Sequence, residues 1–529
     1  MGNDGERRQV KQVRSASVRA RAGGRARERH LLPLTHAPDI VSAARLNAGA
    51  LDALLAIVPY PPSAAALRPL PESARWRELH ERTPARAGSV RSTVLANRRH
   101  TLVVLGYLAS DASSFERLSL AGRMLKEAAA RSPEAVGLLA TGAPGAARAA
   151  LEALLAAALA HAFALPTWRT ATQRERGIRR LVLLNDVGLD TRYTAAVTRG
   201  TNLARWLTSL PPNVLDAHGY RSAIARLARA HGLTLRWLDE RALGRAGAQA
   251  FLAVAAGNAE NGAGIAHLKY RPARSRRPLR PEVALIGKGI LFDTGGVNLK
   301  THRSMLDMHT DMAGSAVALA TLLALAELRA PLAADAWLAI TENRIGPQAY
   351  RPQEVVRAAN GVTIQVIHTD AEGRMVLADT LALAGRTRPR LMIDFATLTG
   401  ACVHALTERM SGVFSNRPEL AAALVVAGRA SGERVWSFPF EADYDAELES
   451  KVADVVQCAL DGKGDHILAT RFLSRFVPSG TPWAHVDLSS ATRSGGLAHV
   501  STDVTGFGVR LALELLLKQN VTQKLEGGR

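Results

Sequence analysis

The stretch PEVALIGKGILFDTGGVNLK (281–300) carries the strongest fold signal in this chain of 529 residues. Its apolar runs are short and bounded by glycine, so we predict a buried strand, a turn, a second strand and a Gly-Gly loop. Lys288 and Asp293 stand where apolar sequence meets glycine, a residue that lets the backbone approach a ligand closely. Buried charges are costly unless they have partners, so this pattern predicts cations or ion pairs at the site.

Two later stretches also set charged residues beside apolar sequence. MHTDMAG (308–314) places Asp311 just before an apolar run at 313–330 that we predict to be a helix. For Asp311 taken alone, a simple helix N-cap is the favoured interpretation. HTDAEGRMVLADTLALA (368–384) continues a β-branched run at 361–368, a predicted strand, and leads into a predicted helix at 375–385.

Asp370 and Glu372 are two positions apart in the third stretch. In an extended segment, residues i and i+2 point to the same side, so both carboxylates can face one site. The alternative is a solvated acidic loop. This loop, however, lies between a predicted buried strand and an apolar helix, where open α/β sheets bind ligands. With Lys300 and Arg374 nearby in sequence, the cluster predicts a site for hard divalent cations such as Mg²⁺, Mn²⁺ or Zn²⁺.

The first half of the chain predicts alternating strands and helices. We expect strands at 101–109, 134–142 and 179–186, with a helix at 146–163. This order is typical of a mainly parallel sheet covered by helices. Because the chain is too long for one ordinary core, we expect two domains with a boundary near 190–215.

Composition limits the classes of protein that the chain can represent. Two cysteines do not indicate a disulfide framework, and they make a four-cysteine zinc site impossible. The longest apolar stretch, 151–165, is shorter than the ~20 residues that span a bilayer, so we predict a packed helix and no membrane partner. Residues 1–30 lack any apolar periodicity and are predicted to be a disordered, Arg-rich tail without a secretory signal.

Charge leaves one alternative open. The chain has 67 basic and 47 acidic residues, a formal net charge of +20. Such a surface can attract nucleic acid, although a solvated Arg-rich surface is the favoured interpretation. HExxH, phosphate-loop and GxSxG motifs are all missing from the sequence. The histidines near the cluster lack metal-site spacing, and His368 is the one best placed to line a pocket.

The motif HTDAEGRMVLADTL (368–381) closely resembles the signature of leucyl aminopeptidases, the cytosol aminopeptidase family of metallopeptidases. The resemblance continues through GKGILFDTGGVNLK (287–300), TENRIGPQAYRPQEVV (341–356) and DFATLTGA (394–401), and ends at 483–510. The first 190 residues match the family only in general α/β character. His368 stands where the family usually has Asn, and Ala313 replaces the first glycine of a usual Gly-Gly pair.

The resemblance implies a role for each residue of the cluster. Five residues would ligate two divalent metal ions: Lys288, Asp293, Asp311, Asp370 and Glu372. Lys300 would stabilise the oxyanion, and Arg374 would hold a bicarbonate that shuttles a proton. The substrate pocket would be lined by Met308, His368, Ala371, Thr397, Leu398 and Gly400. Mn²⁺ or Zn²⁺ is expected, with Mg²⁺ or Co²⁺ as further candidates.

The resemblance also implies the architecture and the setting. We expect a smaller N-terminal α/β domain at 31–195. A larger C-terminal α/β/α catalytic domain at 196–520 would contain a mixed, mainly parallel sheet. The protein would be a cytoplasmic homohexamer that removes N-terminal amino acids from peptides. The alternative is a DNA-binding or architectural protein on the same fold, with secondary or lost peptidase activity.

Overall fold

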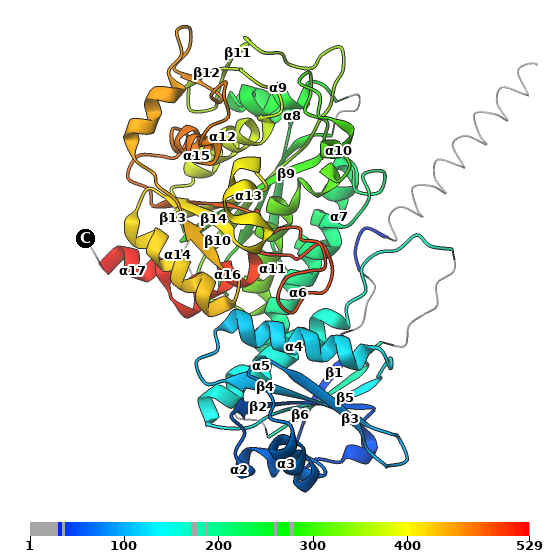
Figure 1. Ribbon diagram of the computed structural model, residues 1–529. Coiled ribbons are helices and arrows are strands. Elements are labelled where there is room, and N and C mark those ends of the chain that lie inside the picture. Colours follow the sequence, from blue (N-terminus) through cyan, green and yellow to red (C-terminus); the bar gives the residue numbers. More distant parts are fainter. Residues whose placement is uncertain are drawn as a thin grey trace, which may run out of the picture.

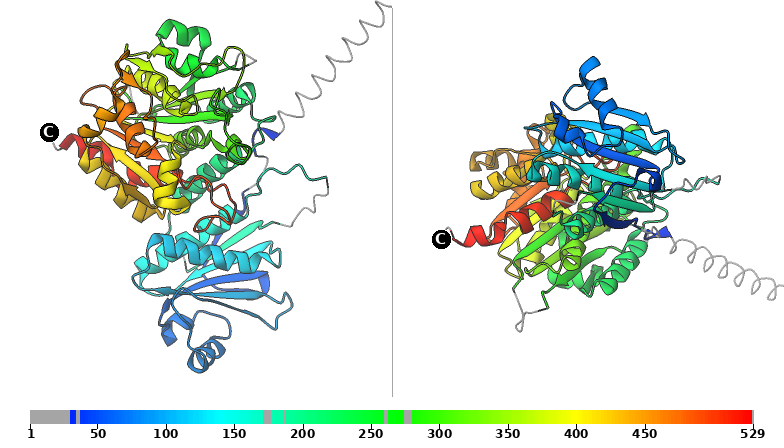
Figure 2. Two further views of the ribbon diagram at one scale, coloured as in Figure 1. Left: turned by 45° about the horizontal axis from the view of Figure 1, so that its top comes forward. Right: turned by 90° about the horizontal axis from the view of Figure 1, so that it is seen from below.

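The structure, a computed structural model, describes residues 30–33, 37–170, 177–185, 188–258, 262–273 and 280–527. The predicted disordered tail, apart from its last residue, lies outside the described residues. Two separate sheets, each covered by helices, form a smaller and a larger body (Figures 1 and 2). This arrangement confirms the predicted α/β class with a smaller N-terminal and a larger C-terminal domain.

The smaller body contains a six-stranded sheet in the order β1-β6-β5-β2-β4-β3, parallel except where β3 pairs with β4. Its strands are β1 (Asp39–Ala43), β2 (Ala53–Tyr60), β3 (Val90–Val94), β4 (Leu102–Ala109), β5 (Ala135–Ala140) and β6 (Arg180–Leu184). One face is covered by α2 (Ala64–Leu67) and α3 (Ser73–Arg82), and the other by α4 (Ser114–Ala129) and α5 (Pro144–His161). The three strands and the helix predicted here are confirmed.

The larger body contains an eight-stranded mixed sheet in the order β15-β14-β17-β13-β9-β10-β8-β7. Its strands are β7 (Thr234–Asp239), β8 (Gly264–Tyr270), β9 (Val283–Asp293), β10 (Ala334–Asn343), β13 (Leu391–Ala396), β14 (Ser411–Ser415), β15 (Val435–Ser437) and β17 (Trp483–Asp487). The central strands β10, β9, β13 and β17 run parallel, and antiparallel pairs join β10 to β8, β8 to β7 and β14 to β17. The sheet is therefore mixed and mainly parallel, as predicted.

Helices cover both faces of this sheet and complete an α/β/α sandwich. One face carries α6 (Thr191–Thr208), α7 (Ala217–Ala230), α11 (Ala313–Glu327), α14 (Pro418–Ser431) and α16 (Val509–Leu513). The other carries α8 (Glu240–Ala246), α9 (Gln249–Ala255), α12 (Glu372–Gly385) and α15 (Asp465–Ser474). The shorter elements are η1 (Ala48–Ala50), α10 (His302–Met305), η2 (Met308–Thr310), α13 (Gly400–Leu406), η3 (Thr407–Arg409), η4 (Ala442–Leu448), η5 (Glu514–Lys518) and α17 (Val521–Gly527).

Strand β9 corrects the prediction of two short strands joined by a turn within 281–300. The segment 283–293 is one continuous strand, without the predicted turn between two shorter strands. Gly287 lies against α11, where an added Cβ would come 2.4 Å from the Cα of Ser315. The glycine therefore allows helix and strand to approach closely, and a glycine used for packing was mistaken for a turn signal. The predicted Gly-Gly loop does follow the strand, with φ of +85° at Gly295 and +66° at Gly296.

The predicted strand at 361–368 is also corrected. Only β12 (Thr363–Gln365) is a strand, and it belongs to a separate three-stranded sheet with β11 (Val355–Arg357) and β16 (Val455–Val456). Beyond it, the backbone N–H groups of Ile367 and His368 donate to the side-chain oxygen of Gln457, each at 3.1 Å. A side chain thus replaces a neighbouring strand, and the chain is free to turn towards α12.

Helix α11 is the most apolar helix of the larger body. The segment His302–Glu327 is long and apolar enough to cross a membrane, but 83% of its most apolar window is buried inside the protein. The helix packs against α6, β9, β10 and β13, so it is a core helix. Helices α5 and α4 lie between the two sheets and contact α6 and α14 (Figure 1). The predicted boundary between residues 195 and 196 lies within α6 and stays a prediction.

Candidate active site

The charged residues of the cluster converge at one edge of the larger sheet. Lys288 and Asp293 lie on β9, and Asp311 directly follows η2. Glu372 and Arg374 lie in the first turn of α12, with Asp370 just before it. The carboxyl ends of β9, β10 and β13 meet the beginnings of α11 and α12 here. Ligands of open α/β sheets bind at this kind of edge.

Two lysines each join a pair of carboxylates. The Nζ atom of Lys288 lies 2.8 Å from Asp311 Oδ2 and 2.9 Å from Glu372 Oε1. The Nζ atom of Lys300 lies 2.9 Å from Asp293 Oδ2 and 2.6 Å from Asp370 Oδ1. The cluster therefore contains two ion-paired triads of alternating charge, and all of their residues but Asp370 and Lys300 are almost wholly buried.

Three of the carboxylates can share one cation. Oxygens of Asp293, Asp370 and Glu372 lie within 4.8 Å of one another. Oε2 of Glu372 is buried and has no hydrogen-bond partner within the described residues. A buried, unpartnered carboxylate oxygen among other carboxylates suits a divalent cation, so this donor set fits the expected metal ions.

The pKa shifts reflect the crowding of negative charge. Burial, followed by the charge of Asp293, raises the pKa of Glu372 to about 8. Burial also raises the pKa of Asp311 to about 6, although the charge of Lys288 acts in the opposite direction. Burial would lower the pKa of Lys288, but the charges of Asp311 and Glu372 more than offset it, and its pKa is raised.

Asp311 is not a helix N-cap, which corrects the interpretation favoured for that residue alone. The N-cap position of α11 is Met312, and no side chain caps the helix. The Asp311 carboxylate points instead to the cluster: Oδ1 accepts a 2.6 Å hydrogen bond from the Thr397 hydroxyl, and Oδ2 pairs with Lys288. Lys288 in turn donates to the backbone oxygen of Thr397 at 3.0 Å. This bond connects the cluster to the segment that follows β13.

Asp370 and Glu372 face the same site, but not for the predicted reason. The segment is a turn that enters α12, with Glu372 as the first helical residue, and is not extended. The predicted helix at 375–385 therefore begins three residues earlier.

Several residues that support the cluster were not predicted from the sequence. Asn343, the last residue of β10, donates from Nδ2 to Asp293 Oδ1 at 2.8 Å and to the backbone oxygen of Thr369 at 3.1 Å. Asp487, at the end of β17, accepts hydrogen bonds from the backbone of Leu398 at 3.0 Å and from the Thr399 hydroxyl at 2.7 Å. Both residues lie at strand ends and inside the stretches 341–356 and 483–510 that carry the family resemblance, which are the signals that could have identified them.

Arg374 has a partner that was also missed. Its Nη2 donates to both carboxylate oxygens of Asp465, at 2.7 and 2.9 Å. Nη1 donates to the backbone oxygen of Gln457 at 3.3 Å. Burial lowers the pKa of Arg374, but the charge of Asp465 more than offsets it, so the guanidinium stays charged.

A cavity of about 720 Å³ opens over the cluster. All thirteen residues predicted for the site line it: Lys288, Asp293, Lys300, Met308, Asp311, His368, Asp370, Ala371, Glu372, Arg374, Thr397, Leu398 and Gly400. The structure therefore brings together every predicted residue. Their separate roles stay predictions.

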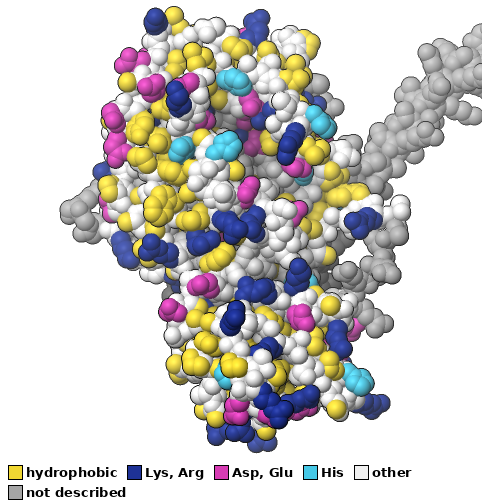
Figure 3. All heavy atoms as spheres, in the orientation of Figure 1, with side chains coloured by type: hydrophobic (Ala, Val, Ile, Leu, Met, Phe, Trp, Pro, Cys, Tyr) yellow, Lys and Arg dark blue, Asp and Glu magenta, His cyan; other side chains and the backbone are white. Residues whose placement is uncertain are grey.

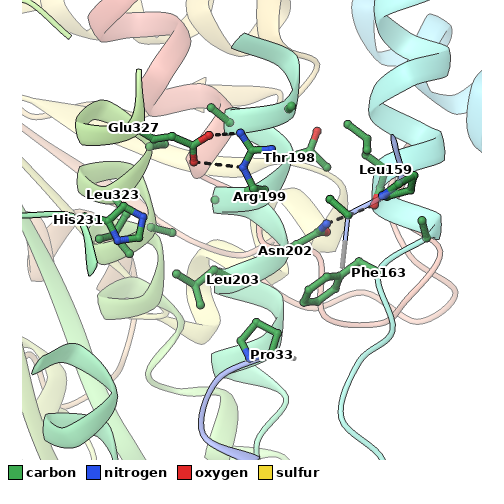
Figure 4. A pocket seen from close by; sticks show the side chains of 18 residues that line it. Pro33, Leu159, Phe163, Thr198, Arg199, Asn202, Leu203, His231, Leu323 and Glu327 are labelled. Carbon is green, nitrogen blue, oxygen red and sulfur yellow. Dashed lines mark hydrogen bonds and ion pairs between the residues drawn. The ribbon is translucent and has the colours of Figure 1, made fainter. Parts of the chain in front are cut away.

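A second cavity, of about 220 Å³, lies where α5, α6 and α11 meet (Figure 4). Its walls are mainly apolar, with Leu159, Phe163 and Leu323 among them, and an ion pair joins Arg199 to Glu327 beside it. Neither the metal-type carboxylates nor the lysines of the cluster reach this cavity. We therefore place the chemistry in the larger cavity.

Comparison with known proteins agrees with this site. The family model for the catalytic domain of the cytosol aminopeptidase family matches residues 202–513. A probable cytosol aminopeptidase of Syntrophotalea carbinolica is 42% identical over 343 residues, which are 63% of this chain and 68% of that protein. A probable cytosol aminopeptidase of a Synechococcus species is 36% identical over 440 residues, 81% of this chain and 88% of that protein.

Solved structures resemble almost the whole chain. The bottromycin maturation enzyme BotP in complex with Mn has a TM-score of 0.75 at 29% identity, covering 89% of this chain and 99% of its own. A mutant of tomato leucine aminopeptidase has a TM-score of 0.79 at 26% identity, covering 92% and 98%. Sequence, site and comparisons agree, and none favours the DNA-binding alternative. The chain belongs to the cytosol aminopeptidase family and is a metal-dependent aminopeptidase.

Proposed function

We propose that Lys288, Asp293, Asp311, Asp370 and Glu372 hold two divalent metal ions that hydrolyse the first peptide bond of a substrate. The observation that carries this proposal is the convergence of four carboxylates and two lysines at one cavity. Asp293, Asp370 and Glu372 supply one group of ligands, and Asp311 with Lys288 the neighbouring one. Mn²⁺ or Zn²⁺ suits the set, as do Mg²⁺ and Co²⁺, and the Mn complex of BotP favours Mn²⁺.

The protein's own residues have distinct tasks in this reaction. When bound, a pair of ions activates water and polarises the scissile carbonyl. Lys300 stays charged, because Asp293 and Asp370 raise its pKa despite burial, and it can donate to the developing oxyanion. One such donor is typically worth ~3–4 kcal/mol of transition-state stabilisation. Lys288 can ligate only after losing its proton, which requires that another cation neutralise Asp311 and Glu372.

The substrate would enter the same cavity by its N-terminal residue. Met308, Ala371, Leu398 and Gly400 offer an apolar surface for its side chain, beside Thr397 and His368. A free α-amine can bind one metal ion, which explains release of single N-terminal residues. We propose no preference for leucine, because His368 and Ala313 depart from the usual family pattern next to the ligands.

Three further properties rest on the family resemblance. We propose that the protein is a homohexamer, which a solution mass six times that of the chain would support. We also propose that it is cytoplasmic. Peptides are the proposed substrates. The resemblance also assigns a bicarbonate to Arg374, but the hydrogen bonds of Arg374 to Asp465 and Gln457 do not suit that group.

The test uses protein stripped with a chelator and reloaded with Mn²⁺ or Zn²⁺. We expect cleavage of aminoacyl p-nitroanilides by the loaded protein and its loss in Glu372→Gln and Asp311→Asn. Both substitutions keep the side-chain volume and remove a negative ligand. Glu354→Gln, which removes a carboxylate from a surface ion pair with Arg351 outside the cavity, is the matched control that keeps activity. Failure to cleave any member of a broad aminoacyl panel with metals bound would contradict the proposal.

A further inference from the structure

Two of the three guanidinium nitrogens of Arg374 already donate to groups of the protein. Nη2 donates to both oxygens of Asp465, and Nη1 donates to the backbone oxygen of Gln457. The remaining nitrogen, Nε, is buried and lacks a hydrogen-bond partner among the described residues. A bicarbonate that bound Arg374 through Nη2 would first have to displace Asp465 from a charge-assisted pair, the strongest class of hydrogen bond in proteins.

Asp465 is the more exposed member of this ion pair. The Arg374 side chain is 2% exposed, whereas that of Asp465 is 26% exposed, and both line the cavity of the proposed metal site. Arg374 lies two residues after Glu372 on the first turn of α12 and interacts with its charge. The structure therefore presents a carboxylate, held by an arginine, on the wall of the cavity that the metal-type carboxylates also line.

A bound carboxylate and a bicarbonate offer the same chemistry. Each has a negative oxygen that can accept a proton and return it, and each can be oriented by a guanidinium. We infer that Asp465, positioned by Arg374, does within this chain what the family resemblance assigns to bicarbonate. The inference rests on the proposed peptide hydrolysis and adds the group that moves its proton.

The proton transfer balances in two steps. As the water oxygen bonds to the carbonyl carbon, Asp465 accepts one proton from that water. As the carbon–nitrogen bond breaks, protonated Asp465 gives the same proton to the leaving amine nitrogen. Asp465 ends as it began, and neither an oxidant nor a second substrate is needed. General acid–base groups of this kind typically contribute 10²–10⁴-fold to the rate.

Two substitutions distinguish a proton-transfer role of Asp465 from a purely structural role. In Asp465→Ala we expect kcat to fall about 100-fold or more, with little change in KM. Bicarbonate added to CO₂-depleted buffer, and to a lesser degree acetate or formate, should restore much of the rate, because the space beside Arg374 is now open. Asp465→Asn should be equally slow and should not recover, since its amide fills that space and accepts no proton.

A matched control is an ion pair between Arg471 of α15 and Asp445 of η4. Arg471 of α15 donates to both oxygens of Asp445, at 2.7 and 2.8 Å, outside the cavity. Asp445→Asn removes a similar pair and should keep the activity of the unmodified protein with no response to bicarbonate. Circular dichroism of each variant checks that α15 is retained.

Three results would overturn the inference. One is a several-fold activation of the unmodified protein by bicarbonate, and the second is full activity in Asp465→Ala. The third is a folded but slow Asp465→Ala that no carboxylate restores, since this would leave Asp465 only a structural role. Lack of hydrolysis by the unmodified, metal-loaded protein would instead contradict the proposed function itself.

Discussion

Asn343 shows how a neutral residue can control a charged site. Its fully buried amide donates to both Asp293 and the backbone of Thr369, the residue before Asp370. Asn343 thus fixes one carboxylate directly and the position of a second through the backbone. Residues that orient metal ligands in this way typically change metal affinity 10–100-fold when they are replaced.

Replacing Asn343 with leucine should therefore weaken Mn²⁺ binding by about 10–100-fold, measured by calorimetric titration of the stripped protein. Leucine keeps the volume and removes both hydrogen bonds. Asn360→Leu is the control, because that amide donates to the backbone of Arg475 at the exposed surface. Equal Mn²⁺ affinity in all three proteins would show that Asn343 does not position the ligands.

Protons and metal ions compete for Glu372 and Asp311. Their pKa values in the folded protein, about 8 and about 6, exceed the ordinary values of 4.5 and 3.8. Without metal, these two carboxyl groups hold more protons in the folded state than in the unfolded state between their ordinary and their raised pKa values. The free energy of unfolding therefore falls as the pH rises through this window. Divalent cations bind the ionised carboxylates, so their stabilising effect grows over the same window.

Thermal unfolding should show this competition. The rise in melting temperature caused by Mn²⁺ should be larger above pH 8 than below pH 6, bounds set by the two pKa values. Glu372→Gln should lose most of this pH dependence, because its amide carries no proton to displace. A rise in melting temperature that is the same at both pH values would contradict the assignment of these ligands.

Sequence predicted the charged residues of the site far better than their neutral and distant partners. Lys288 and Glu372 stand out because charge is rare beside apolar runs and glycine. Asn343 is uncharged and ends its strand without any such contrast, and Asp487 was not singled out although it stands between Val486 and Leu488. Asp465 meets Arg374 only through the packing of α15 on α12, 91 positions apart in sequence, which no local pattern records.

Among the elements, β9 and α11 form the contact on which the site is built. An added Cβ at Gly287 would meet the Cα of Ser315 at 2.4 Å and the backbone oxygen of Gly314 at 2.6 Å. These atoms belong to a buried helix and cannot move aside like the end of a flexible side chain. Lys288 and Asp311 extend from either side of this contact, so its geometry sets the distance between them.

Gly287→Ala should therefore lower the free energy of unfolding by about 1–3 kcal/mol, the usual cost of overpacking, and reduce activity further by shifting Asp311. Chemical denaturation measures the first effect and p-nitroanilide hydrolysis the second. Gly145→Ala is the control: it lies in the first turn of α5 with open space around its Cα, and should be neutral. Unchanged stability in Gly287→Ala would show that β9 and α11 are not tightly packed there.

Elements with a regular pattern were predicted well, and those shaped by the site were not. Three strands and one long helix of the smaller body, and helices α11 and α12 of the larger body, were predicted from their apolar runs. The predicted turn at Gly287 failed because a strand glycine and a turn glycine look alike in sequence. The strand at 361–368 stopped early because Gln457, about ninety positions later, takes over its hydrogen bonds.

At the scale of the whole molecule, the net charge of +20 does not form a single patch on the face that Figure 3 shows. Lys and Arg side chains are spread over both bodies, with Asp and Glu among them. This distribution fits the favoured interpretation of a solvated Arg-rich surface. It contrasts with the active site, where carboxylates gather inside a basic protein and favour the entry of cations.

We propose that the whole protein works through two metal ions at this cluster. The rate of aminoacyl p-nitroanilide hydrolysis during titration of stripped protein with Mn²⁺, with bound metal measured in parallel, tests this claim. We predict no hydrolysis before metal is added, full activity at two ions per chain, and none at any concentration in Glu372→Gln. Full activity in stripped protein, or unchanged activity in Glu372→Gln, would contradict the claim.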